Sequence, residues 1–210
     1  MIQIYENDSN TRQNKRRLAT KTNVMLDLKD ELPLLFDAFK EAHELYEHEI
    51  RRTPPEARAR GFEALSLNSK MIQCVQKRFP NNWKFGKYGR FILRVNSYVI
   101  LFKKLDKHDR PMNIKTKSVK AISNQLSLPL FNNVDFVEEP ILFFGYKKNA
   151  LGVVSQPKLA YLDEERVEWI VSANDIKIDK PTEQLSVGTQ KDPAPKLRKR
   201  KAANNKKSSQ

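Results

Sequence analysis

The sequence predicts an α+β protein: N-terminal amphipathic helices packed on an antiparallel sheet of about five strands built from hairpins, with disordered basic tails. Two observations predict this class. Apolar residues recur at helical spacing before residue 80, whereas β-branched and aromatic residues alternate at period two after residue 90. No repeat period typical of a solenoid or a propeller is visible. We therefore expect helices first and hairpins second, joined in one hydrophobic core.

The first expected helix is long and amphipathic. Asp30 is suited to be its N-cap, and Pro33 is tolerated in its first turn. The apolar stripe consists of residues spaced three or four apart: Leu28, Leu32, Leu35, Phe36, Phe39, His43, Tyr46 and Ile50.

Two shorter helices are expected next. Thr53-Pro54-Pro55-Glu56 has the form of a capping box with prolines in the first turn, so it predicts a second helix that carries Phe62. Asn68 or Ser69 is suited to cap a third helix, which ends near Pro80. The helical part of the chain therefore contains three predicted helices.

A β-hairpin follows the helices. Residues 91–95 and 98–102 are rich in β-branched and aromatic residues, and Asn96-Ser97 forms the two-residue turn between them, although the favoured Asn-Gly pair is missing. If Val95 faces Tyr98, one face of the hairpin is wholly apolar. We expect that face to pack against the helices.

A second β unit is expected near the C-terminal end of the fold. Residues 141–146 form a strand, residues 147–152 turn, and the chain returns through residues 153–162, where Pro157 marks an edge or a bulge. Residues 166–171 form the last strand. These strands complete the predicted sheet.

The composition predicts one domain between loose ends. Residues 1–23 and 179–210 are polar, basic segments with little to bury, and they flank a single α+β domain at 24–178. No apolar run is long enough to span a membrane, and the N-terminus lacks the layout of a secretory signal. We therefore expect no membrane partner and a cytoplasmic location, associated with the nucleoid in a bacterium or nuclear in a eukaryote.

The sequence predicts no cofactor and no metal site. Cys74 is the single cysteine, which excludes an internal disulfide and a multi-cysteine zinc site, and its neighbours predict a buried position. Residues 86–90 (GKYGR) do not match a P-loop, and no dinucleotide-binding glycine motif is present. His43 and His48 lie on the acidic helix without a third ligand.

The charge of the chain is concentrated in two places. The formal net charge is +14, from 39 Lys and Arg against 25 Asp and Glu. Residues 51–120 hold eighteen bases and four acids, and residues 191–210 hold eight bases and one acid. Residues 24–50 are acidic instead, so part of the positive charge is expected to be neutralised within the molecule.

Binding to nucleic acid is the leading functional hypothesis. A basic segment with interleaved aromatic residues is typical of proteins that contact phosphates and stack bases, and the sequence does not distinguish DNA from RNA. The central candidates are Lys84, Lys87, Tyr88, Arg90, Arg94, Lys103, Lys104, Lys107, Arg110, Lys115, Lys117 and Lys120. The candidates in the tail are Lys196, Arg198, Lys199, Arg200 and Lys201.

Two other classes of function remain open. The second hypothesis is a protein-interaction module, such as an inhibitor, an antitoxin-like partner or a phage or host-defence accessory factor, whose basic centre binds an acidic partner protein. The third is an enzyme, and then a small nuclease. A metal-dependent site would use Asp135, Glu138, Glu139, Asp163, Glu164, Glu165 and Glu168. A metal-free site would use Tyr88, Arg90, Arg94, Lys103 and His108.

Overall fold

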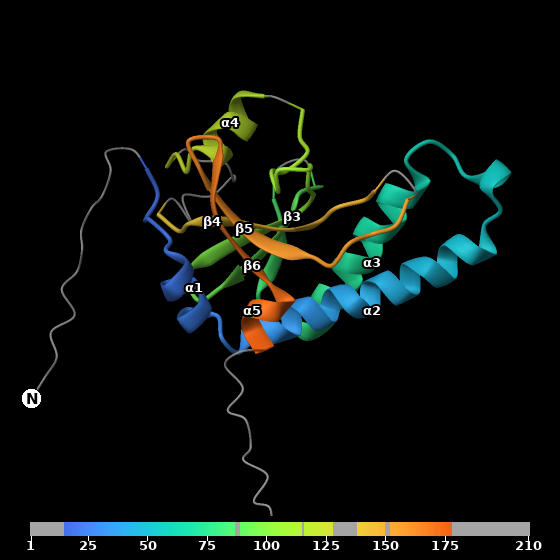
Figure 1. Ribbon diagram of the computed structural model, residues 1–210, viewed down its shortest axis with the longest axis horizontal. Helices are drawn as coiled ribbons and strands as arrows, with labels where there is room; N and C mark the ends of the chain where they lie inside the picture. The colour runs from blue at the N-terminus through green and yellow to red at the C-terminus, as the bar shows by residue number, and fades with distance from the viewer. Residues whose placement is uncertain (1–14, 87–88, 115, 128–137, 150–151, 178–210) are drawn as a thin grey trace, which may run out of the picture. The chain divides into compact units, whose positions relative to one another are not determined.

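The computed structural model describes residues 15–86, 89–114, 116–127, 138–149 and 152–177 (Figure 1). Its helices are α1 (Lys21–Asp27), α2 (Glu31–Arg52), the 3₁₀ turn η1 (Pro55–Ala57), α3 (Phe62–Arg78), α4 (Lys117–Ser123) and α5 (Ala173–Lys177). Its strands are β1 (Trp83–Phe85), β2 (Phe91–Val95), β3 (Tyr98–Lys104), β4 (Ile141–Tyr146), β5 (Lys158–Asp163) and β6 (Arg166–Ser172).

The described strands form one six-stranded sheet in the order β1-β2-β3-β4-β5-β6. The predicted α+β class is confirmed, but the sheet is mixed, because β3 and β4 run parallel while the other neighbours are antiparallel. A parallel pair needs a crossover connection, and residues 105–140, which include α4, supply it. The expectation of a purely antiparallel sheet was wrong at this one pairing.

The predicted hairpin is confirmed in its turn and its register. Asn96 and Ser97 have φ values of 44° and 62°, as a type I′ turn requires. Val95 is opposite Tyr98, and Leu93 is opposite Ile100. The right-handed twist of the two strands therefore continues through a two-residue connection.

The helical face of the sheet, covered by α2 and α3, holds the larger core. Figure 1 shows these two helices on one side of the sheet and α4 on the other. Aromatic rings cross this face from strand to strand, with Phe91 and Phe102 at 5.5 Å between ring centroids, and Phe102 and Phe144 at 5.9 Å. Phe36 of α2 meets Phe144 edge-on at 5.2 Å, so the longest helix is fixed directly on the central strands.

The opposite face of the sheet holds a second, smaller core. Ile122 of α4 packs there on the apolar side chains of the inner strands: Ile92, Val99, Leu101, Ile141, Phe143, Ala160 and Leu162. Thr116 caps α4 by accepting a hydrogen bond from the Val119 amide at 3.2 Å. Because only one short described helix covers this face, loops and hollows surround α4.

The helical region differs from the sequence prediction in one respect. The second and third predicted helices are one helix, α3, and Asn68 and Ser69 lie exposed within it. The prolines after Thr53 form only the turn η1, and Gly61, with φ of 86°, precedes the first residue of α3. A residue with that φ is outside the helical region, so the helix begins at the next residue.

The N-terminal segment is folded from residue 15, earlier than the predicted boundary at 24. Arg16 is 3% exposed, and its amide donates to the Gln125 carbonyl at 2.7 Å. The Trp169 indole donates to the Ala19 carbonyl at 2.8 Å. Composition could not indicate this, because the segment is held by backbone hydrogen bonds and by side-chain contacts of Lys15 and Arg16 to parts of the chain that are distant in sequence. The remaining predicted loose segments, 1–14 and 178–210, lie outside the described residues.

Candidate nucleic-acid interface

Part of the central basic segment is neutralised by the acidic helix α2, as expected. Glu41 pairs with Lys77 at 3.1 Å and with Arg78 at 2.7 Å, and these hydrogen bonds lower the pKa of the Glu41 carboxyl. Glu49 lies 3.8 Å from Lys70. The basic residues of α3 therefore stabilise the contact between α2 and α3.

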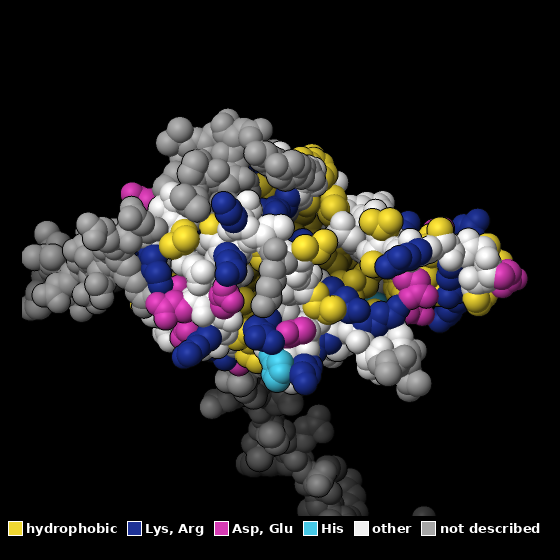
Figure 2. Space-filling model, turned by 90° about the horizontal axis from the view of Figure 1, so that it is seen from above, with side chains coloured by type: hydrophobic (Ala, Val, Ile, Leu, Met, Phe, Trp, Pro, Cys, Tyr) yellow, Lys and Arg dark blue, Asp and Glu magenta, His cyan; other side chains and the backbone are white. Residues whose placement is uncertain are grey.

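Two of the predicted binding arginines have acidic partners. Arg94 donates to Glu139 through Nε at 2.9 Å and through Nη2 at 2.5 Å. Arg110 donates through Nε to Asp106 at 3.1 Å. Figure 2 shows the same intermixing on the face seen from above, where Lys and Arg side chains alternate with acidic and apolar ones.

Arg90 and Lys103 form a pair of cations without an acidic partner among the described residues. Arg90 precedes β2, and Lys103 lies near the end of β3. Both side chains are partly buried and line the same two hollows. Burial, and to a lesser degree the charge of Arg90, lower the pKa of Lys103. An anion placed between these two groups would stabilise the charged form of Lys103 and offset its repulsion by Arg90.

The hollows beside Arg90 and Lys103 continue toward α4. A cavity of about 280 Å³, which Asn68 and Ile72 of α3 also line, holds both cations. A small hollow beside the two cations shares Asn113, Val119 and Ser123 with a larger cavity of about 580 Å³. We call these three neighbouring hollows together the α4 groove. Two segments that the crossover brings together, residues 110–114 and α4, line its larger cavity.

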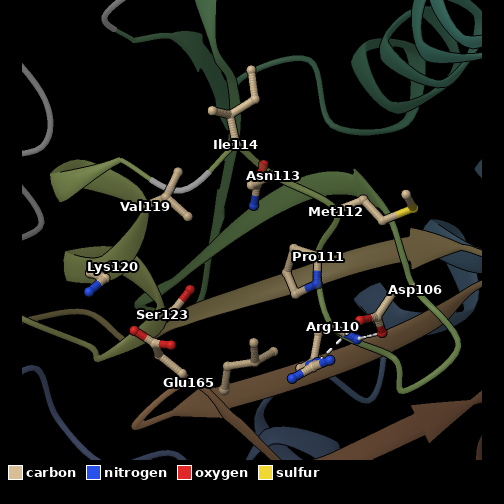
Figure 3. Close-up of a pocket in the computed structure, with 11 residues that line it drawn as sticks. Asp106, Arg110, Pro111, Met112, Asn113, Ile114, Val119, Lys120, Ser123 and Glu165 are labelled. Carbon is tan, nitrogen blue, oxygen red and sulfur yellow. Dashed lines mark hydrogen bonds and ion pairs between the residues drawn. The ribbon is translucent and has the colours of Figure 1, made fainter.

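Figure 3 shows the larger cavity of the α4 groove. Val119 and Lys120 extend from α4 on one side, and Asp106 with its partner Arg110 lies across the cavity. Lys120, which lines the cavity, and Lys117, which does not, are both exposed and have no acidic partner in the described ranges. The polar lining residues Asn113 and Ser123 could not be predicted from the sequence, because neither belongs to a charge run or a motif.

The remaining central candidates lie elsewhere. Lys84 is partly buried on β1 opposite Ile92, and Lys107 is exposed, with its carbonyl accepting from Lys147 Nζ at 3.1 Å. Lys104 is opposite Tyr146 on the helical face of the sheet, whereas Lys103 faces the α4 side. Strand alternation separates these adjacent lysines. Lys87, Tyr88, Lys115, Lys196, Arg198, Lys199, Arg200 and Lys201 lie outside the described residues.

An exposed aromatic side chain lies near the cation pair. Phe85 of β1 is 53% exposed, and its ring contacts Phe91 edge-on at 5.6 Å. Phe91 lines the same cavity as Arg90 and Lys103. A large exposed ring beside partly buried cations is the combination that single-stranded nucleic-acid sites use for stacking and phosphate contacts.

The described residues do not bring together a catalytic site for either of the two nuclease hypotheses. In the described part of the chain, no group of three or more His, Cys, Asp or Glu side chains is placed to hold a metal ion. Glu139 forms an ion pair with Arg94, Lys15 contacts Asp163 and Glu164, and Asp135 lies outside the described residues.

The metal-free nuclease site is not brought together either. Neither Arg94 nor His108 lines the hollows that Arg90 and Lys103 share.

None of the described helices is both long and apolar enough to cross a bilayer. No protein-family model, curated protein or solved structure matches this chain. The geometry of its surfaces is therefore what supports a function.

Proposed function

We propose that this protein binds nucleic acid through the α4 groove, mainly by contacts to the phosphate backbone. The observation that carries the proposal is the cation pair of Arg90 and Lys103, partly buried and without an acidic partner in the described residues. Burying two like charges together is unfavourable unless an anion compensates them, and phosphate is a strong hydrogen-bond acceptor for both groups.

A further cation extends this site along the groove. Lys120 of α4 lines the groove, is exposed and is unpaired among the described side chains, so three unpaired positive groups line this surface. The exposed ring of Phe85 adds a stacking surface. Stacking requires an unpaired base, so we expect a single-stranded segment to bind more tightly than a duplex.

The test is fluorescence anisotropy with labelled single-stranded RNA, single-stranded DNA and duplex DNA, measured in a salt titration on the full chain. Lys196, Arg198, Lys199, Arg200 and Lys201 are first replaced by glutamine, so that the tail does not mask the groove. We then expect the double variant Arg90→Glu and Lys103→Glu to weaken binding at least about tenfold. The slope of log affinity against log salt should fall by roughly 1.4 to 1.8, because each phosphate contact contributes about 0.7 to 0.9.

The matched control reverses two exposed cations of the helical side, Lys29→Glu and Lys40→Glu. It changes the net charge equally, so it measures the general effect of charge. Equal losses in the two double variants would contradict a site at the α4 groove. If the parent protein binds none of the three nucleic acids, the proposal is wrong, and the alternative of an acidic protein partner takes its place.

A further inference from the structure

A second polar cavity lies on the helical face of the sheet, apart from the α4 groove. It has a volume of about 410 Å³ and is enclosed by the end of α2, the connection through η1, the start of α3 and the ends of β3 and β4. We call it the Tyr146 pocket. Its walls combine apolar groups, such as Phe62 and Leu67, with charged groups from four separate parts of the chain.

Three cations and one carboxylate line the Tyr146 pocket. Arg58 is held firmly: it donates to the carbonyls of Thr53 at 2.9 Å and Ile50 at 2.8 Å, and to Glu63 at 3.3 Å. Lys148 hydrogen-bonds the same Glu63 carboxylate, and this bond lowers the pKa of Glu63 and raises that of Lys148.

Lys104 is the third cation of the pocket, and it has no acidic partner in the described ranges. Its neighbours Arg58 and Lys148 share the single carboxylate of Glu63. The lining charges therefore leave an excess of two positive charges. Such an excess around a cavity attracts an anion that carries about two negative charges.

Tyr146 supplies an unused hydrogen-bond donor in the same cavity. Its side chain is 6% exposed and makes no hydrogen bond to another described residue, although it lies opposite Lys104 in the parallel pairing of β3 and β4. Burial raises the pKa of Tyr146 to about 12, so its hydroxyl keeps its proton at neutral pH. The Tyr146 hydroxyl is accessible from the pocket rather than fully buried, so it can donate a hydrogen bond to a bound acceptor.

We propose that the Tyr146 pocket binds a small organic phosphate monoester, with Lys104 and Tyr146 contacting the phosphate and the apolar wall at Phe62 and Leu67 contacting the organic part. A phosphate monoester carries about −1.5 to −2 charges at neutral pH, which matches the excess of the lining, whereas a carboxylate carries only one. The pocket is also larger than a bare phosphate ion requires, and its apolar wall suits a carbon skeleton.

This proposal is independent of nucleic-acid binding, because the Tyr146 pocket shares none of its lining residues with the hollows of the α4 groove. Calorimetry on the full chain is the test, with phenyl phosphate, benzoate and inorganic phosphate as probes up to about 10 mM. Phenyl phosphate and benzoate present the same ring with different charge, and inorganic phosphate lacks the ring. We expect phenyl phosphate to bind most tightly.

Three variants assign the contacts. Lys104→Met removes the charge and keeps the side-chain stem, and it should weaken phenyl phosphate binding about tenfold or more. Tyr146→Phe removes only the hydroxyl and should weaken binding several-fold. Lys107→Met is the control, because this lysine is exposed in the following loop and does not line the pocket, and it should leave affinity unchanged.

Circular dichroism and the melting temperature establish that each variant is folded. The proposal is overturned if the parent protein does not bind phenyl phosphate, or if benzoate or inorganic phosphate binds as tightly. It is also overturned if Lys104→Met and Tyr146→Phe both keep the parent affinity, or if Lys107→Met loses as much as Lys104→Met.

Discussion

The side-chain amide of Gln125 pairs with the backbone of Ile141 as a neighbouring strand would. Nε2 donates to the Ile141 carbonyl at 2.9 Å, and Oε1 accepts from the Ile141 amide at 2.9 Å. Nε2 also donates to the Leu162 carbonyl at 2.8 Å. Gln125, 1% exposed, thus joins the end of the α4 segment to β4 and β5.

Gln125→Ala is expected to lower the free energy of unfolding by about 2 to 4 kcal/mol, because it leaves buried backbone groups of Ile141 and Leu162 without partners. Urea denaturation followed by circular dichroism measures the change. Gln73→Ala is the control, since Gln73 is exposed on α3 and its loss should cost less than about 0.5 kcal/mol. An equal effect of the two substitutions would show that the amide of Gln125 adds nothing to stability.

Gly145 is required by the close approach of β3 and β4. A Cβ atom at this position would overlap the Lys103 carbonyl oxygen and lie 2.8 Å from Leu105 Cγ. Gly145→Ala should therefore destabilise the protein by about 2 kcal/mol or more. At Gly61, φ is 86° but no atom lies within 4 Å of an added Cβ, so Gly61→Ala should cost only about 1 kcal/mol. The reverse order of these two losses in thermal denaturation would contradict the packing argument.

The β2–β3 turn carries conformational strain that one substitution can relieve. Ser97 has a φ of 62°, which a side chain disfavours and glycine adopts freely. Ser97→Gly should raise the free energy of unfolding by about 0.5 kcal/mol, the difference between relieved strain and added chain entropy. Ser97→Ala keeps the strain and should not stabilise. A Gly variant that is no more stable than the Ala variant would count against this account.

Stability is expected to fall in acid partly because of Asp175. Hydrogen bonds from Lys21, at 2.8 Å, and from Ser172 hold the pKa of this carboxyl well below its ordinary value. A lowered pKa in the folded state stabilises the protein above the pKa of the unfolded chain, near 3.9, and this stabilisation is lost as the pH falls further. The melting temperatures of the parent and Asp175→Asn should therefore differ most at pH 7, and the difference should shrink steadily as the pH falls below about 4. A constant difference would exclude this linkage.

The local parts of the fold were predictable from the sequence. The two-residue turn at Asn96 and Ser97 and the stripe of α2 depend on neighbouring residues, and both are confirmed. The parallel pairing of β3 and β4 depends on where residues 105–140 return, and short-range periodicity contains no such information. The folding of residues 15–20 depends on partners about 110 to 150 positions away.

The candidate sites also combine local features that the sequence predicts with long-range contacts that it does not predict. The sequence identified the basic segment, but not which of its cations have acidic partners, because Glu139 meets Arg94 across 45 positions. Lys103 and Lys104 were predicted as one patch, although alternation along a strand already places adjacent side chains on opposite faces. The Tyr146 pocket joins residues from Tyr46 to Val154, and no spacing rule relates them.

The backbone contacts of the N-terminal segment also set an order of events during synthesis. Ala19 accepts a hydrogen bond from Trp169, a residue 150 positions later in the chain. At about 5 to 20 residues per second, the ribosome takes roughly 8 to 30 s to make that partner. Until then this hydrogen bond cannot form, so residues 15–20 complete their docking only after the last strand of the sheet has been made.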